Sequence, residues 1–285
     1  MREDRLWPVS LRMTPADFRI GEQHVLFHGI NKSGSGAFAD VIHAAFFKAG
    51  RANQIFSTYH GCPRTVEAVL EIIRCSETSK RLVFIGHYLY GASPLNSKAP
   101  AYATIFRHPL PRIISCHSWL ANKHRAAGGT GTYPTLEAFV KSSQGKSQAQ
   151  ILQFGIGFGE RRKQAMKAKT AKEIYETCMA NVDNDLLWFG LAELFEESIF
   201  LLADQLALPY VPNWKRDTRN PARVSAFDVP RGLRNLIEKE YEYDFLFYEN
   251  MLKRFKASLT TVEFGPEFFA YKLECAGEYK DRILA

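Results

Sequence analysis

A glycine- and serine-rich loop around Lys32 is the part of this sequence best suited to chemistry. Gly29, Gly34 and Gly36 flank the lysine. Backbone N–H groups at the start of a helix bind phosphate well, and glycines allow the backbone to approach it closely. The loop is not a nucleotide-hydrolase motif, because that motif has glycine directly before the lysine and this chain has Asn31. The loop alone fits a phosphate site and an ordinary strand-to-helix turn equally well.

A second segment, residues 107–115, adds an arginine and a serine. Its sequence, Arg-His-Pro-Leu-Pro-Arg-Ile-Ile-Ser, places Arg107 at the end of a predicted strand and Ser115 about two turns into the next helix. A guanidinium fork and a hydroxyl can together hold a terminal phosphate. Taken alone, an arginine after a strand is often a surface residue, so this segment gains its meaning beside the first.

Strands that alternate with helices must position these two segments. Apolar runs predict strands at residues 24–30, 53–57, 81–85, 101–106 and 186–191. Helical spacing predicts helices at residues 37–47, 65–74, 193–206 and 232–255, and a further helix that starts at Pro109 or Pro111. This order predicts a single α/β domain, residues 1–285, with a central parallel sheet flanked by helices. The polar stretch 128–181, with loops at 128–131 and 142–145, could hold an acceptor-side insertion.

Composition narrows the class of protein. The 285 residues are 46% hydrophobic and 24% charged, and the formal charge of +7 favours anionic ligands. The sequence contains no apolar run of about eighteen residues, which predicts a cytoplasmic protein without a membrane span. The five cysteines include no close pair, so buried free thiols are expected rather than a metal site or a disulfide framework.

Together, the two segments resemble the two cofactor signatures of sulfotransferases that use 3'-phosphoadenosine 5'-phosphosulfate (PAPS), specifically the carbohydrate (heparan/uronyl) 2-O-sulfotransferase-like group. Residues 31–38 (Asn-Lys-Ser-Gly-Ser-Gly-Ala-Phe) stand where that family has Pro-Lys-Thr-Ala-Ser/Gly-Thr-Ser. Residues 107–115 are similar to its Arg-Asp-Pro-x-x-Arg-x-x-Ser signature. Residues 189–198 resemble its Val-Gly-x-Thr-Glu-x-x-Glu-x-Ser region, and residues 243–249 resemble a late helix with Asp followed by Tyr-Glu. The four matches occur in the order that the family shows.

The resemblance implies a P-loop-like sulfotransferase fold and assigns roles to individual residues. The 5'-phosphosulfate is expected on Asn31, Lys32, Ser33, Gly34, Ser35, Gly36 and Ala37, and the 3'-phosphate on Arg107 and Ser115. Gly36 and Ala37 replace hydroxyl residues of the family, so Ser33 and Ser35 are expected to supply the hydroxyl contacts. His108 replaces the aspartate of the second signature.

A catalytic base is expected at His87, directly after the third predicted strand. It falls on the second histidine of the family's His-Gly-His-x-x-Tyr segment, whereas Ile85 takes the place of the first. The carboxyl ends of parallel strands share one edge of the sheet, so His87 is expected near Lys32. Without the resemblance, a structural histidine at a strand end would be the better interpretation.

The expected reaction is transfer of the sulfuryl group of PAPS to a hydroxyl of a carbohydrate, a glycoconjugate or a small molecule, without a metal and without a nucleic-acid partner. Lys32 and His87 are the expected catalytic residues. One alternative is a P-loop kinase-like phosphotransferase, which would require Mg²⁺ and an acidic metal ligand. Another is a non-catalytic protein that binds anions or nucleic acid.

Overall fold

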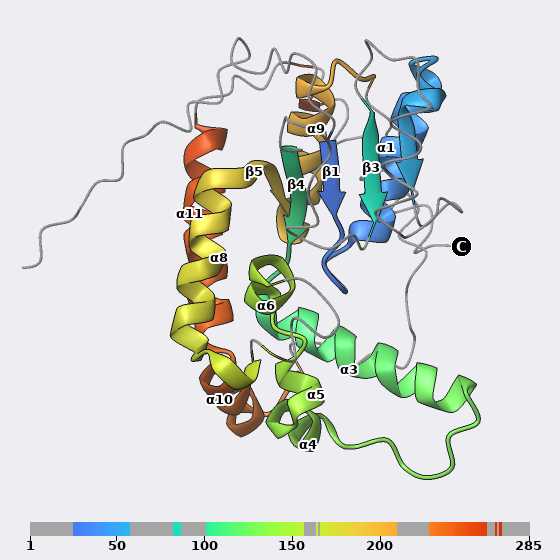
Figure 1. Ribbon diagram of the computed structural model, residues 1–285. Coiled ribbons are helices and arrows are strands. Elements are labelled where there is room, and N and C mark those ends of the chain that lie inside the picture. The colour runs from blue at the N-terminus through green and yellow to red at the C-terminus, as the bar shows by residue number, and fades with distance from the viewer. Residues whose placement is uncertain are drawn as a thin grey trace, which may run out of the picture.

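A parallel sheet forms the centre of the molecule (Figure 1). The computed structural model describes residues 25–57, 82–86, 101–156, 164, 166–209, 228–260, 266, 268 and 269. Within these residues, five strands pair in the order β2-β3-β1-β4-β5, and all four pairings are parallel. The strands are β1 (Val25–His28), β2 (Ile55–Ser57), β3 (Val83–Gly86), β4 (Ala101–Phe106) and β5 (Leu186–Leu191). The predicted α/β domain with a central parallel sheet is therefore confirmed.

Helices cover both faces of the sheet. The described α-helices are α1 (Ser35–Lys48), α3 (Pro109–Ala126), α4 (Leu136–Lys141), α5 (Ser143–Lys146), α6 (Gln150–Gly155), α8 (Ala171–Asp185), α9 (Phe195–Gln205), α10 (Arg231–Glu240) and α11 (Glu242–Leu259). One core cluster joins the sheet to α1 and α9, and the other joins it to α3, α6, α8 and α11. Burial on both faces explains the continuous apolar runs in the strands.

The region predicted as one long helix, residues 232–255, is two helices. The chain breaks at Tyr241, whose φ of −118° departs from helical geometry and whose carbonyl accepts the N–H groups of Asp244 and Phe245. The break turns α11 away from α10, so that α11 lies beside α8 while α10 packs near α4 (Figure 1). Tyr241 and Asp244 are both buried at this corner.

The loop predicted at residues 142–145 is also a short helix. Ser142 caps it, because its hydroxyl accepts the N–H of Gly145 at 3.0 Å. A side chain at position 145 would overlap the carbonyl oxygen of Phe139. Gly145 is thus present for close packing rather than for a loop. The helix predicted at residues 65–74 lies outside the described residues.

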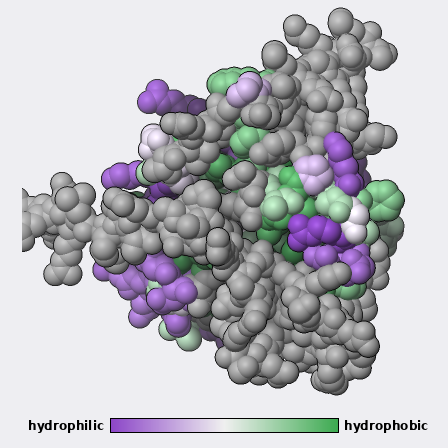
Figure 2. All heavy atoms as spheres, turned by 90° about the horizontal axis from the view of Figure 1, so that it is seen from above, coloured by the Kyte–Doolittle hydropathy of each residue, from purple (hydrophilic) through white to green (hydrophobic). Residues whose placement is uncertain are grey.

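The strands run downward in Figure 1, so their carboxyl ends point toward α3 and α6. Figure 2 looks at the opposite end, where the strands begin, and shows both hydrophobic and hydrophilic side chains among the described residues there. The polar residues that the sequence singled out follow the carboxyl ends of the strands. The candidate site therefore lies at the lower edge of the sheet.

Gly190 in β5 provides a test of the packing between the sheet and α9. A methyl group at this position would lie 2.7 Å from Cβ of Ser198 and 2.7 Å from the ring of Trp188, both of which are buried. We expect Gly190→Ala to lower the free energy of unfolding by about 1–3 kcal/mol, because the core must shift to admit the methyl group. Urea denaturation measures the change.

Gly232→Ala is the matched control, because a methyl group at residue 232 would meet no atom within 4 Å. Its free energy of unfolding should equal or slightly exceed that of the wild type, since alanine favours the helix. Equal losses in the two variants would contradict the packing described here.

Candidate functional site

The candidate site lies where the chain leaves neighbouring strands in opposite directions. After β1 the chain enters α1 on one face of the sheet, and after β4 it enters α3 on the other. β1 and β4 are neighbours, with His28 opposite Thr104. Ligands of open parallel sheets bind in the crevice that such a divergence creates, outside the carboxyl ends of the strands. The loop after β1 and Arg107 after β4 flank this crevice.

The loop between β1 and α1 has a backbone suited to an anion. Lys32 and Gly34 both adopt left-handed conformations, with φ of 62° and 97°. The first helical hydrogen bond of α1 joins Phe38 N to the oxygen of Gly34 at 3.0 Å, and no side chain caps the helix. The N–H groups of Ser35, Gly36 and Ala37 precede that bond and so have no carbonyl partner within the helix. Such N–H groups, together with the helix dipole, attract negative charge.

The hydroxyl groups of Ser33 and Ser35 bind the backbone at the start of the loop. Both donate to the carbonyl of Ile30, at 2.9 Å and 3.0 Å, and they lie 2.9 Å from each other. Both serines are buried. Their expected role as hydroxyl ligands of a phosphosulfate stays a prediction, and their observed role is to hold the turn.

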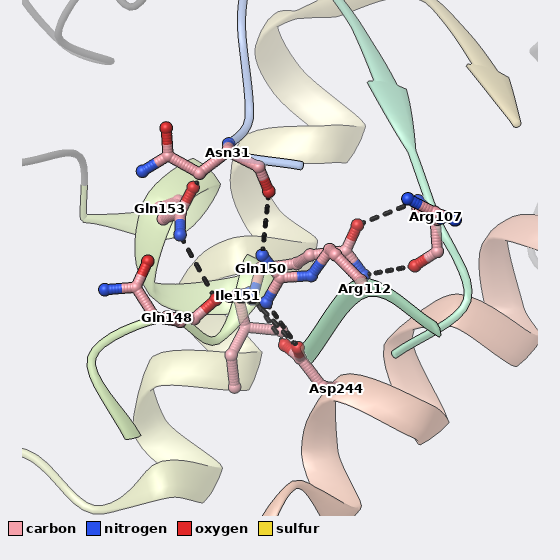
Figure 3. Close-up of polar contacts among 8 residues, drawn as sticks. All are labelled: Asn31, Arg107, Arg112, Gln148, Gln150, Ile151, Gln153 and Asp244. Atoms are coloured by element: carbon pink, nitrogen blue, oxygen red, sulfur yellow. Dashed lines mark hydrogen bonds and ion pairs between the residues drawn. The ribbon is translucent and has the colours of Figure 1, made fainter. Parts of the chain in front are cut away.

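Two arginines from the second segment bind the backbone of the loop, and Figure 3 shows the bond of Arg112 to Asn31. Nη1 of Arg107 donates to the carbonyl of Lys32 at 3.1 Å, and Nη1 of Arg112 donates to the carbonyl of Asn31 at 3.2 Å. The structure therefore brings Arg107 and the Lys32 loop together, because β1 and β4 are parallel neighbours that end at the same edge of the sheet. These bonds fix the two peptide groups on either side of the Cα of Lys32, which are the Asn31–Lys32 and Lys32–Ser33 peptides. A left-handed lysine is strained by about 1–2 kcal/mol, so its surroundings must hold it in place.

Arg112 is fully buried and pairs with Asp244 of α11. The two side chains lie 3.4 Å apart, and neither is exposed. Asp244 also accepts the N–H groups of Gln150 and Ile151, at 2.9 Å and 3.0 Å. Burial raises the pKa of Asp244, whereas Arg112 and the two N–H groups act to lower it.

Three glutamines complete the buried network. Gln150 pairs with both backbone groups of Arg107: its Oε1 accepts from the N–H at 2.8 Å, and its Nε2 donates to the carbonyl at 2.7 Å. Gln153 accepts the N–H of Asn31 at 2.8 Å and donates to the carbonyl of Gln148 at 3.1 Å. The segment within the expected insertion, residues 128–181, thus lies against both predicted cofactor segments.

The cations of the site act together on one buried thiol. Burial raises the pKa of Cys116, and the positive charges of Arg112, Lys32 and Arg107 act to lower it. Cys116 and Cys178 are buried free thiols, and the prediction of buried free thiols is confirmed for these two cysteines.

A polar cluster borders the site beyond β5. Glu193 accepts the N–H of His108 at 3.0 Å and the hydroxyl of Tyr248 at 2.7 Å. The imidazole of His108 packs edge-on against Phe245 and Tyr248. Burial lowers the pKa of His108, and Glu193 is the strongest of the carboxylates that oppose this shift.

Not every predicted site residue can be placed. Ser115 lies in α3 and is largely buried, and its expected role in holding the 3'-phosphate stays a prediction. β3 ends at Gly86, opposite His28 of β1, but the expected base His87, which follows Gly86 in the sequence, lies outside the described residues. Within the described residues, no group of three or more His, Cys, Asp or Glu side chains is arranged to hold a metal ion.

Sequence reasoning assigned no role to several residues of the network. Arg112 and Asp244 stood within two of the family-like segments, but only their contact shows that they act as a pair. One feature of the sequence could have indicated the role of the three glutamines: they are interspersed with apolar residues over positions 148–154. Polar side chains within an apolar run indicate buried hydrogen bonding.

No protein-family model matches the chain, and a comparison with curated proteins found no significant match. The family resemblance thus rests on the four sequence motifs alone. Among the described helices, none is both long and apolar enough to cross a membrane.

His108 predicts a pH dependence of stability. Its pKa is lowered in the folded protein, so the unfolded chain binds more protons between that pKa and the ordinary value near 6.5. The stabilisation that the neutral imidazole contributes is present above about pH 6.5 and is lost as the pH falls through the folded pKa. We expect the difference in melting temperature between wild type and His108→Gln to shrink from pH 7.5 to pH 5. A difference that grows on acidification would contradict the lowered pKa.

Proposed function

We propose that this chain is a PAPS-dependent sulfotransferase with a P-loop-like sulfotransferase fold. The observation that carries the proposal is the bond from Nη1 of Arg107 to the carbonyl of Lys32, at 3.1 Å. It joins the two segments whose sequences resemble the 5'-phosphosulfate and 3'-phosphate signatures. The other two family-like segments lie beside them, through the bond of Glu193 to His108 and the pair of Asp244 with Arg112. Four motifs, spread from residue 31 to residue 249, thus meet at one edge of the sheet.

The residues present fit a ligand with two anionic ends. At one end, the uncapped first turn of α1 offers N–H groups and Lys32 offers an ammonium group. At the other, Arg107 offers a guanidinium, with Ser115 on the helix that follows. PAPS carries a phosphosulfate at its 5' end and a phosphate at its 3' end, which gives the two groups of donors separate tasks. The N–H groups, Lys32 and Arg107 supply positive charge without a metal ion.

PAPS supplies an activated sulfuryl group, and the chain's own residues would position it and move one proton. Lys32 would neutralise the charge that develops on the oxygens around sulfur. His87 would take the proton of the acceptor hydroxyl while the new S–O bond forms and the S–O bond to the 5'-phosphate breaks. The parallel pairing of β3 with β1 supports this role, because it brings the end of β3 beside the start of the Lys32 loop.

The acceptor is proposed to be a hydroxyl of a carbohydrate, a glycoconjugate or a small molecule, because the motifs resemble those of a carbohydrate sulfotransferase group. A kinase-like phosphotransferase is the second candidate, since its substrates would use the same N–H groups and lysine. The absence of a glycine directly before Lys32 counts against it.

Binding of the product nucleotide, 3'-phosphoadenosine 5'-phosphate, tests the proposal directly. At about a hundred times the dissociation constant, a ligand of the folded state adds about 2.7 kcal/mol of stability. We expect this nucleotide to raise the melting temperature by several degrees without Mg²⁺. A protein that responds only to ATP with Mg²⁺ would be a phosphotransferase instead, and one that responds to neither would refute both proposals.

Lys32→Ala tests the catalytic role of the loop lysine. We expect the sulfuryl transfer rate, measured with labelled PAPS, to fall at least about a hundredfold, because one charge-stabilising group is lost from the transition state. The fold should remain, as judged by circular dichroism. Lys48→Ala is the matched control, since Lys48 is the exposed last residue of α1, far along the helix from its first turn. Retained turnover in Lys32→Ala would refute the assignment.

A further inference from the structure

We infer that Arg112 and Asp244 are positioning residues, whose buried ion pair holds the Lys32 loop in the shape that binds the phosphosulfate end of PAPS. The inference rests on the proposed function for the identity of the ligand. It adds α11, a helix more than two hundred residues along the chain, to the parts that build the loop. It also gives a task to a fully buried charge that the proposed chemistry does not otherwise use.

The guanidinium of Arg112 contacts three acceptors from three parts of the chain. Nη1 donates to the carbonyl of Asn31 at 3.2 Å, and Nη2 donates to the carbonyl of Gln148 and lies 3.4 Å from Asp244. Figure 3 shows these groups converging on Arg112 from β1's loop, from the segment before α6 and from α11. A guanidinium presents its N–H donors in a rigid plane, whereas an ammonium group is a compact charge on a flexible stem.

Hydrogen bonds link Asn31, Gln153, Gln148 and Arg112 in a closed ring. The carbonyl of Asn31 accepts from Arg112, and its N–H donates to Gln153 at 2.8 Å. Gln153 in turn donates to the carbonyl of Gln148, which also accepts from Arg112. Both backbone groups of the residue before Lys32 are thus fixed by buried partners. Lys32 itself has a left-handed backbone conformation, which persists only where the surrounding structure holds it. The contacts of Asn31 therefore help to fix the backbone of Lys32.

Asp244 holds the guanidinium of Arg112 in place through their ion pair. Its two carboxylate oxygens accept the N–H groups of Gln150 and Ile151, the first two residues of α6. A carboxylate at the start of a helix also interacts favourably with the helix dipole. Asp244 therefore sets the position of α6, which carries Gln150 and Gln153, as well as that of Arg112. The loop, α6 and α11 are held by one carboxylate.

A merely structural ion pair would also be buried, so the test needs a readout that stability alone does not move. Arg112→Lys keeps the positive charge and removes the fork. We expect it to raise the dissociation constant for 3'-phosphoadenosine 5'-phosphate at least about tenfold, as measured by calorimetry. We also expect faster amide hydrogen exchange in peptides that cover residues 29–36, because the Asn31 peptide loses its anchor.

Arg254→Lys is the matched control. Arg254 also lies in α11 and pairs with Asp183 of α8, with 2.7 Å between the charged groups. This pair contacts neither the loop nor α6 in the described residues. We expect Arg254→Lys to change the melting temperature without changing the nucleotide affinity or the exchange of residues 29–36.

Asp244→Asn extends the test to a variant of the same size as the wild type. Asparagine keeps one acceptor oxygen but loses the charge that faces Arg112, so the same two readouts should move in the same direction. If Arg112→Lys does not fold, this variant decides the matter. Wild-type affinity and wild-type exchange of residues 29–36 in a folded variant would overturn the positioning role.

The two proposals can fail separately. If the wild-type protein does not bind the nucleotide, the sulfotransferase proposal falls, and amide exchange still tests whether Arg112 and Asp244 hold the loop. If the wild type binds and the variants bind equally well with unchanged exchange, the positioning role falls and the sulfotransferase proposal stands.

Discussion

The arrangement of the candidate site depends on one buried ion pair, that of Arg112 with Asp244. Arg112 extends from the first turns of α3 to the loop after β1, and Asp244 extends from α11 to the start of α6. The pair joins α3 and α11, which lie on one side of the sheet, to the loop between β1 and α1 (Figure 3). Helix α1 itself lies on the other side of the sheet. Loss of either charge would leave its partner buried and unpaired, which in proteins costs about 3–5 kcal/mol.

The topology of the sheet explains why the pair lies where it does. Parallel strands end at one edge, so the segments after β1, β4 and β5 must meet there even though they are far apart in sequence. The divergence of α1 and α3 to opposite faces opens a crevice between the ends of β1 and β4. Lys32 and Arg107 lie on its two sides, and Glu193 and His108 pair where the chain leaves β5 and β4. The fold therefore gathers the cations, and the ion pair fixes the backbone that presents them.

Much of this arrangement could be predicted from local patterns. The strands were recognisable as continuous apolar runs, and the family resemblance assigned Lys32 and Arg107 to one cofactor site. The break at Tyr241 could not be predicted, because Ile237, Tyr241, Tyr248, Met251 and Phe255 keep helical spacing across it and all are buried. The partner of Arg112 was equally hidden, since Asp244 is 132 residues away in the sequence. Buried polar contacts between distant segments leave no periodic signal, and so they escape a pattern-based prediction.

An apolar pair of the same volume would often be as stable as a buried ion pair, or more stable. Here the neighbours explain why charges are present. Replacing Arg112 by an apolar residue would remove a donor from the carbonyls of Asn31 and Gln148, and replacing Asp244 would leave the N–H groups of Gln150 and Ile151 without their acceptor. Each buried backbone group left without a partner costs about 1–3 kcal/mol. The pair thus satisfies backbone groups that the irregular loop and the short helix α6 cannot satisfy themselves. The irregular loop that is suited to an anion therefore needs buried hydrogen-bond partners for its backbone. Arg112 is one of them, and its pairing with Asp244 links the chemistry of the loop to α11.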